Sequence, residues 1–189
     1  MKVIFLDHDG VICLSSEWGS RFKKTKAYSN PNPGGERNVP VEFRFDNFNK
    51  KAIATLNSIL EKTGAEIVVS SDWKGWCTVE EMGDYYESQG IIKRPIDFTG
   101  NVIDSEKITW HRAWDLEGTR SLEIKEWLGN HPEVTHWVAV DDLNMAKIGL
   151  DYSVQFEHEW GLDNFVLTPR DNEGIKQCGI KEKILSFLS

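Results

Sequence analysis

The chain has 189 residues, of which 40% are hydrophobic and 28% are charged, and its formal net charge is −8 at pH 7. This length suits one domain with a sizeable core, and the composition is that of a globular protein rather than a disordered one. No apolar run approaches the roughly 20 residues of a membrane-spanning helix, and the acidic charge argues against a generic binder of long duplex nucleic acid. We therefore expect one domain over residues 1–189.

The three cysteines, Cys13, Cys77 and Cys178, show no metal-ligand spacing, and an odd number cannot all pair within the chain. Free thiols are typical of a reducing compartment. The first apolar run is short and ends at Asp7, unlike the apolar region of a secretory signal peptide. These features predict a cytoplasmic location and no association with a membrane.

The chain begins with the apolar residues 3–6, which are followed by Asp7, His8, Asp9 and Gly10. Such a run is typical of a buried strand in a parallel sheet. Open α/β sheets place their ligand sites just past the carboxyl ends of the strands, and Gly10 allows a sharp turn there. Because buried carboxylates are costly unless they are paired or bound to a cation, this segment predicts a cation site.

The segment 14–46 shows poor periodicity and contains a run rich in Pro, Gly and Asn. A loop of this length in a compact domain usually has a function, so we expect a small cap inserted over the site. The cap carries a basic cluster, which is more often a solvated surface than a substrate contact; within it, Lys23 and Lys24 are candidates for substrate binding. The cluster consists of Arg21, Lys23, Lys24 and Lys26.

Strands and helices alternate over the rest of the chain. Apolar residues recur at helical spacing in 47–62, and Gly64 is a natural helix stop. This alternation predicts βαβ units and therefore an α/β fold with a doubly wound, mostly parallel sheet. The expected helices cover residues 47–62, 79–89, 121–128 and 180–188, and the expected strands cover residues 3–6, 66–70, 137–140, 153–156 and 164–168.

Polar residues follow three of the expected strands: Asp7 and Asp9, Ser70 and Ser71, and Asp141 and Asp142. Because the carboxyl ends of parallel strands lie at one edge of a sheet, we expect these groups to converge. Carboxylates that meet there repel one another, and a hard cation such as Mg²⁺ removes that repulsion. A carboxylate can also attack phosphorus as a nucleophile. A plainer alternative is that the serines and the paired acids cap helices, the acids before a helix over 144–149.

The first motif is Asp7-His8-Asp9-Gly10-Val11, the second is Ile67-Val68-Val69-Ser70, and the last is Val138-Ala139-Val140-Asp141-Asp142. These motifs resemble, in type and order, those of the haloacid dehalogenase (HAD) superfamily of phosphotransferases. The superfamily also has a Lys or Arg at a helix start before the last motif. The resemblance covers residues 1–142 and implies a HAD-like core with a small cap.

Three further segments support a narrower likeness: Ser70-Ser71-Asp72-Trp73-Lys74, Arg120-Ser121-Leu122-Glu123-Ile124 with Trp127-Leu128, and Phe165-Val166-Leu167-Thr168 followed by Gly174-Ile175. They look like the HAD domains associated with RNA-repair proteins, which are relatives of polynucleotide kinase phosphatase domains.

The superfamily resemblance implies a role for each motif residue. Asp7 would be the nucleophile and a metal ligand. Asp9 would be the general acid and base, with its backbone carbonyl facing the metal, and Ser70 would hydrogen-bond the transferring phosphoryl group. The remaining implied site residues are Gly10 and Ser71 on the substrate side, and Asp141 and Asp142 at the Mg²⁺ site, with Asp142 preferred as the direct ligand.

Two residues are candidates for the basic group of the third motif. Arg120 precedes the expected helix 121–128, so its side chain could point to the sheet edge, and Lys125 lies a turn further in, toward solvent. We prefer Arg120, although lysine is the commoner residue at this position of the superfamily.

We therefore expect Mg²⁺-dependent hydrolysis of a phosphomonoester through phosphorylated Asp7. The basic cluster and nearby aromatic residues favour a nucleotide or a 3′ or 5′ nucleic-acid end as substrate. Two alternatives stay open: a phosphoprotein phosphatase, and a non-catalytic receiver-like module, in which the acids after the first strand are usually adjacent. The loop tryptophans, among them Trp18, Trp73 and Trp76, are expected to pack in the fold rather than stack on bases, although a flat apolar ring suits both uses.

Overall fold

The computed structural model describes residues 1–27, 39–100, 116–150, 155–157 and 160–189. Part of the expected cap and the first half of the expected strand 153–156 lie outside these residues.

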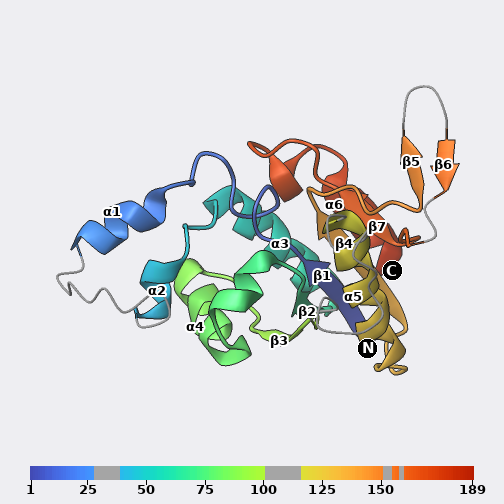
Figure 1. Ribbon diagram of the computed structural model, residues 1–189, viewed down its shortest axis with the longest axis horizontal. Helices are drawn as coiled ribbons and strands as arrows, with labels where there is room; N and C mark the ends of the chain where they lie inside the picture. The colour runs from blue at the N-terminus through green and yellow to red at the C-terminus, as the bar shows by residue number, and fades with distance from the viewer. Residues whose placement is uncertain (28–38, 101–115, 151–154, 158–159) are drawn as a thin grey trace.

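Five parallel strands form the central sheet, in the order β3-β2-β1-β4-β7 (Figure 1). The chain runs from β1 outward through β2 to β3, then returns to the other side of β1 for β4 and β7, which confirms the doubly wound arrangement. Ligand sites of such sheets lie where the strand order reverses, and here that point is between β1 and β4. The strands are β1 (Lys2–Leu6), β2 (Glu66–Val69), β3 (Pro95–Phe98), β4 (His136–Asp141) and β7 (Phe165–Leu167).

Helices cover both faces of the sheet because successive strand side chains point to opposite sides. Ile4 and Leu6 pack into a core with side chains of α3, α4 and α6, whereas Val3 and Phe5 pack on the other face with Ile124 of α5. The helices are α3 (Lys50–Thr63), α4 (Val79–Gln89), α5 (Leu116–Gly129) and α6 (Ile180–Phe187).

The expected cap segment contains α1 (Ser20–Ala27) and α2 (Val41–Arg44) at the left of Figure 1, where α2 packs against α4 and α1 packs against α2. Ionic and hydrogen-bonded contacts hold the two helices in place. The Lys24 ammonium donates to the backbone carbonyl of Phe45 at 2.7 Å, and Arg44 forms a two-pronged ion pair with Glu81 of α4. Asp46 accepts hydrogen bonds from backbone N–H groups at the start of α1.

Several boundaries differ from the sequence-based expectations. Helix α5 begins at Leu116, four residues before Arg120, and β3 was not predicted because its four residues include a proline and an aspartate. The alternative helix over 144–149 is wrong: this segment leads into β5 (Ile148–Leu150), which pairs antiparallel with β6 (Gln155–Glu157). Two short 3₁₀ helices, η2 (Asp72–Trp76) and η4 (Gly174–Lys176), complete the described elements. Within the described part of the chain, no helix has the length and apolarity needed to cross a membrane.

The start of α3 provides a test of the fold. Asn49 Oδ1 accepts hydrogen bonds from the backbone N–H groups of Lys51 (3.1 Å) and Ala52 (3.3 Å), which would otherwise lack partners in the helix. We expect Asn49→Ala to lower the free energy of unfolding by about 1 kcal/mol and Tm by about 2–4 °C. Chemical and thermal denaturation measure this, with Lys50→Ala as the matched control at the adjacent exposed position. Equal stability of Asn49→Ala and wild type would contradict the cap.

Candidate active site

The carboxyl edge of the sheet carries a row of polar side chains, one from each strand. The residues at the strand ends continue the hydrogen-bonded ladder: Asp7 N–H donates to Val140, and Ser70 N–H donates to Leu6. These backbone hydrogen bonds align the strand-end residues in a row along the edge of the sheet. The row consists of Thr99, Ser70, Asp7, Asp141 and Thr168, in the order of strands β3, β2, β1, β4 and β7.

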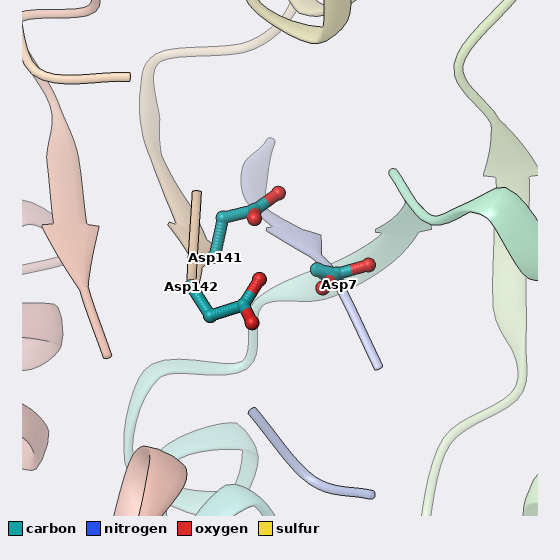
Figure 2. A group of neighbouring side chains, drawn as sticks. All are labelled: Asp7, Asp141 and Asp142. Carbon is teal, nitrogen blue, oxygen red and sulfur yellow. The ribbon is translucent and has the colours of Figure 1, made fainter. Parts of the chain in front are cut away.

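Three carboxylates gather at the switch point between β1 and β4 (Figure 2). Ligand atoms of Asp7, Asp141 and Asp142 all lie within 4.8 Å of one another. Asp7 and Asp141 are buried, and Asp142 is exposed. Burial and the charge of Asp141 raise the pKa of Asp7 well above its usual value, and burial raises the pKa of Asp141 to about 6. The cluster therefore favours a bound cation, and three converging carboxylates suit the hard oxygen coordination of Mg²⁺.

Gly10 is required for the geometry of this cluster. Its φ is +69°, a conformation that favours glycine. A Cβ at this position would lie 2.5 Å from Oδ2 of Asp142. Any side chain here would displace that carboxylate, so Gly10 shapes the acidic cluster itself.

Arg120 is the basic group of the site. Its guanidinium contacts Asp141 at 2.9 Å, Asp7 at 3.4 Å and Asp72 at 2.9 Å. Burial lowers the pKa of Arg120, but the charges of Asp141 and Asp7 outweigh burial and raise it. Arg120 is only 9% exposed, and it lies in the second turn of α5 rather than at the helix start on which its choice from the sequence rested.

Asp9 is set apart from the three clustered carboxylates. Its Oδ2 accepts a hydrogen bond of 2.8 Å from the Trp73 indole N–H. The Trp73 ring stacks against Phe45 and Phe48, with centroid distances of 4.7 and 5.4 Å. Burial raises the pKa of Asp9, although the Trp73 hydrogen bond opposes the shift. A carboxyl group with a raised pKa suits proton transfer, and Trp73 fixes its orientation.

His8 occupies the position between the two motif carboxylates and is completely buried. Its Nε2 is 2.7 Å from the Tyr86 hydroxyl, and its ring lies 4.7 Å from that of Trp73. Burial lowers the pKa of His8 to about 3, with a further contribution from Arg120, so the imidazole is neutral. His8 therefore supports Trp73 rather than carrying charge into the site.

The hydroxyl groups at the edge differ in their partners. The Ser71 hydroxyl lowers the pKa of Asp7 against the effect of burial, and it accepts a hydrogen bond of 3.5 Å from the Trp73 backbone N–H. The buried hydroxyls of Ser70 and Thr168 have no hydrogen-bond partner among the described residues, although buried polar groups are normally paired. Thr99 is engaged by the Lys74 ammonium at 3.0 Å. Unpaired hydroxyls on the two strands that flank β1 and β4 suit an oxygen-rich ligand such as a phosphoryl group.

The three lysines considered for substrate binding lie in different environments. Lys24 is turned inward, and its ammonium contacts the Phe45 carbonyl and the Tyr85 hydroxyl, so its contacts hold α1 in place. Lys23 is exposed on α1. The charged groups that influence the pKa of Lys125 are Asp163 and Lys147, not the clustered acids.

Sequence reasoning missed Trp73, Asp72 and Thr168 as parts of the site. All three lie within four residues of the end of a strand. Residues that directly follow strands of a parallel sheet line its ligand edge, so their position was the available signal.

A comparison with protein-family models matched residues 3–168 to the HAD domain in Swiss Army Knife RNA repair proteins. The chain belongs to this family. Membership implies a phosphatase-type hydrolase, and the parallel sheet with its acidic carboxyl edge is consistent with a HAD fold. Searches of curated proteins and of solved structures found no significant match.

The acidic cluster of this HAD domain predicts stabilisation by Mg²⁺. A ligand that binds only the native state raises stability by RT ln(1 + [L]/Kd), about 2.7 kcal/mol at a hundredfold excess over Kd. We expect Mg²⁺ to raise Tm of the wild type, and Asp142→Asn to reduce that rise because it removes one of the three carboxylates. Thermal denaturation across a Mg²⁺ titration measures both, with Asp171→Asn as the control at an exposed carboxylate outside the cluster. An identical Mg²⁺ response in wild type and Asp142→Asn would argue against this ligand set.

Proposed function

We propose that the protein is a Mg²⁺-dependent phosphomonoester hydrolase that acts through phosphorylated Asp7 on nucleotides or nucleic-acid ends. The observation that carries the proposal is that two carboxylates, two residues apart in the sequence, lie in different environments. Asp7 lies among the clustered acids and beside Arg120, whereas Asp9 is held by Trp73 at the border of a separate cavity.

In the first step, a carboxylate oxygen of Asp7 attacks phosphorus and the bond to the leaving oxygen breaks. Asp9 gives its proton to that leaving oxygen. In the second step, Asp9 takes a proton from water, the water oxygen attacks phosphorus, and the bond to Asp7 breaks to release inorganic phosphate. Burial raises the pKa of Asp9, which is the direction that suits a general acid.

Other residues hold the phosphoryl oxygens. The Arg120 guanidinium, within 3.4 Å of Asp7, is suited to the charge on them, as are the hydroxyls of Ser70 and Ser71. Mg²⁺ would be held by Asp7, Asp141 and Asp142, with the backbone carbonyl of Asp9, and would supply further charge stabilisation when bound.

The substrate assignment rests on the family and on the cap. The matched family is described from RNA repair proteins. Arg21, Lys23 and Lys26 add positive charge to α1, and Arg21 lines the same cavity as Asp9. A phosphoprotein phosphatase with the same chemistry is the second candidate. A receiver-like module is disfavoured because Asp7 and Asp9 are separated by one residue and have different partners.

The first test is phosphate release from a panel of substrates, with Mg²⁺ and with a chelator. The panel contains an aryl phosphate, nucleoside 3′- and 5′-monophosphates, end-phosphorylated oligonucleotides and phosphopeptides. We expect metal-dependent release, highest for a nucleotide or an oligonucleotide end, and a loss on the order of 10⁴-fold in kcat for Asp7→Asn. Circular dichroism verifies that the variant is folded. Wild-type turnover by folded Asp7→Asn would refute the covalent mechanism.

A second test separates the two candidates for the basic group. Arg120→Ala should reduce kcat/KM by about 10²-fold or more, because Arg120 contacts both Asp7 and Asp141. Lys125→Ala on the same helix is the matched control, and its kcat/KM should stay within about threefold of wild type because Asp163 and Lys147 are the charges near it. Steady-state kinetics on the preferred substrate, with Tm of both variants, decide the assignment. Equal or reversed losses would exclude Arg120.

A further inference from the structure

A cavity of about 240 Å³ lies between the acidic site and the cap segment. It is lined by Asp9, Arg21, Arg44, Phe45, Asp46, Asp72, Trp73 and Trp76. Under the proposed function, the oxygen that leaves phosphorus must lie next to Asp9. The group bonded to that oxygen then extends into this cavity, so the lining defines the chemistry of the leaving group.

Most charged groups in the lining are already engaged by the protein. Asp46 accepts hydrogen bonds from the start of α1, Arg44 is paired with Glu81, and Asp72 is paired with Arg120. Among the described residues, the Arg21 guanidinium contacts the Phe22 ring at 5.0 Å and forms no ion pair. The cavity therefore offers a ligand the Asp9 carboxyl group, the Arg21 cation and aromatic surface.

The aromatic surface comes from Trp76. Trp73, three residues earlier, is 9% exposed and packed between phenylalanines, whereas Trp76 is 48% exposed. Arg44 Nη1 donates to the backbone carbonyl of Trp76 at 3.1 Å, which anchors the end of η2 to the cap segment. An exposed ring on an anchored backbone is a pre-organised stacking platform, and order already present in the free protein lowers the cost of binding.

Trp76 also lines a second cavity, of about 370 Å³, with Arg44, Lys74, Gly75, Cys77, Thr78 and Glu81. The two cavities share Trp76 and Arg44. Trp76 therefore borders both the cavity that Asp9 lines and a second cavity that Asp9 does not line. Two adjoining cavities suit a single-stranded nucleic acid whose terminal nucleotide enters the first cavity and whose next nucleotide enters the second.

We propose that Trp76 stacks on the terminal base of a single-stranded nucleic acid whose end phosphate lies at Asp7, with Arg21 next to the adjoining phosphodiester. The proposal rests on the proposed function and adds the residue that recognises the leaving nucleoside. Single-strand binders combine such aromatic platforms with cations along the backbone, and stacking tolerates any base. A duplex end offers its terminal base only after unpairing, so single-stranded ends bind better.

The test compares two end-phosphorylated oligonucleotides that differ only in whether the terminal residue carries a base or is abasic. Trp76→Ala should lower kcat/KM for the base-containing oligonucleotide about 5- to 150-fold, the equivalent of ~1–3 kcal/mol for one stacked base. For the abasic oligonucleotide, wild type and Trp76→Ala should agree within about twofold, because the interaction is already absent. Trp76→Phe should recover much of the loss, since a ring remains. Trp18→Ala is the control at an exposed tryptophan outside the cavity lining.

Equal losses of Trp76→Ala on the two oligonucleotides would overturn the proposal and give Trp76 a structural role, while leaving the proposed hydrolase intact. A loss confined to a phosphotyrosine peptide would also overturn it, because the ring would then recognise a protein side chain.

A binding measurement keeps the test independent of turnover. Fluorescence anisotropy with labelled forms of the two oligonucleotides gives Kd for Asp7→Asn and for Asp7→Asn combined with Trp76→Ala. A base-dependent weakening of about 5-fold or more supports the stacking site even if the proposed hydrolysis fails. Identical affinities would overturn it.

Discussion

Repulsion among carboxylates at the carboxyl edge of the sheet is the constraint on which the rest of the site depends. Asp7 and Asp141 are buried and close together, and burial disfavours their charged forms. Arg120 reaches between them from α5 and offsets part of this cost. The remaining negative charge, including that of Asp142, favours the binding of a cation at this edge of the sheet. The same arrangement that is unfavourable for folding thus suits the metal and the phosphoryl group of the proposed function.

Aromatic packing links this edge to the cap segment. Phe45, which directly follows α2, stacks on Trp73, and the indole N–H of Trp73 holds Asp9. His8 also contacts this ring, at a centroid distance of 4.7 Å. The Trp73 side chain therefore belongs both to the hydrophobic core and to the site. We expect a shift of the cap segment to change the orientation of Asp9 through Trp73. This contact links the cap segment to the proposed catalytic residues.

Much of the fold could be predicted from periodicity and from helix-ending residues. The helix over residues 79–89 was predicted to the residue, with Gly90 as its end; the structure adds a capping box of Thr78 and Glu81 at its start. β3 was missed because only four residues, with a proline and an aspartate among them, form it through pairing with β2. Arg120 was selected for its place at a helix start, and that reason was wrong, yet the side chain does reach Asp7 from the second turn.

The sequence by itself determined most of the strands and helices around the site and the paired acids at the ends of β1 and β4, because these depend on local spacing of apolar and polar residues. Only the tertiary structure decided which partners each charged or aromatic side chain finds. Lys23 and Lys24 are adjacent, but only Lys24 turns inward to the Phe45 carbonyl. Trp73 is buried against Phe45 of the cap segment and Phe48 just before α3, while Trp76 remains exposed beside the cavity. Burial and pairing depend on segments far apart in the chain, so no local pattern contains them.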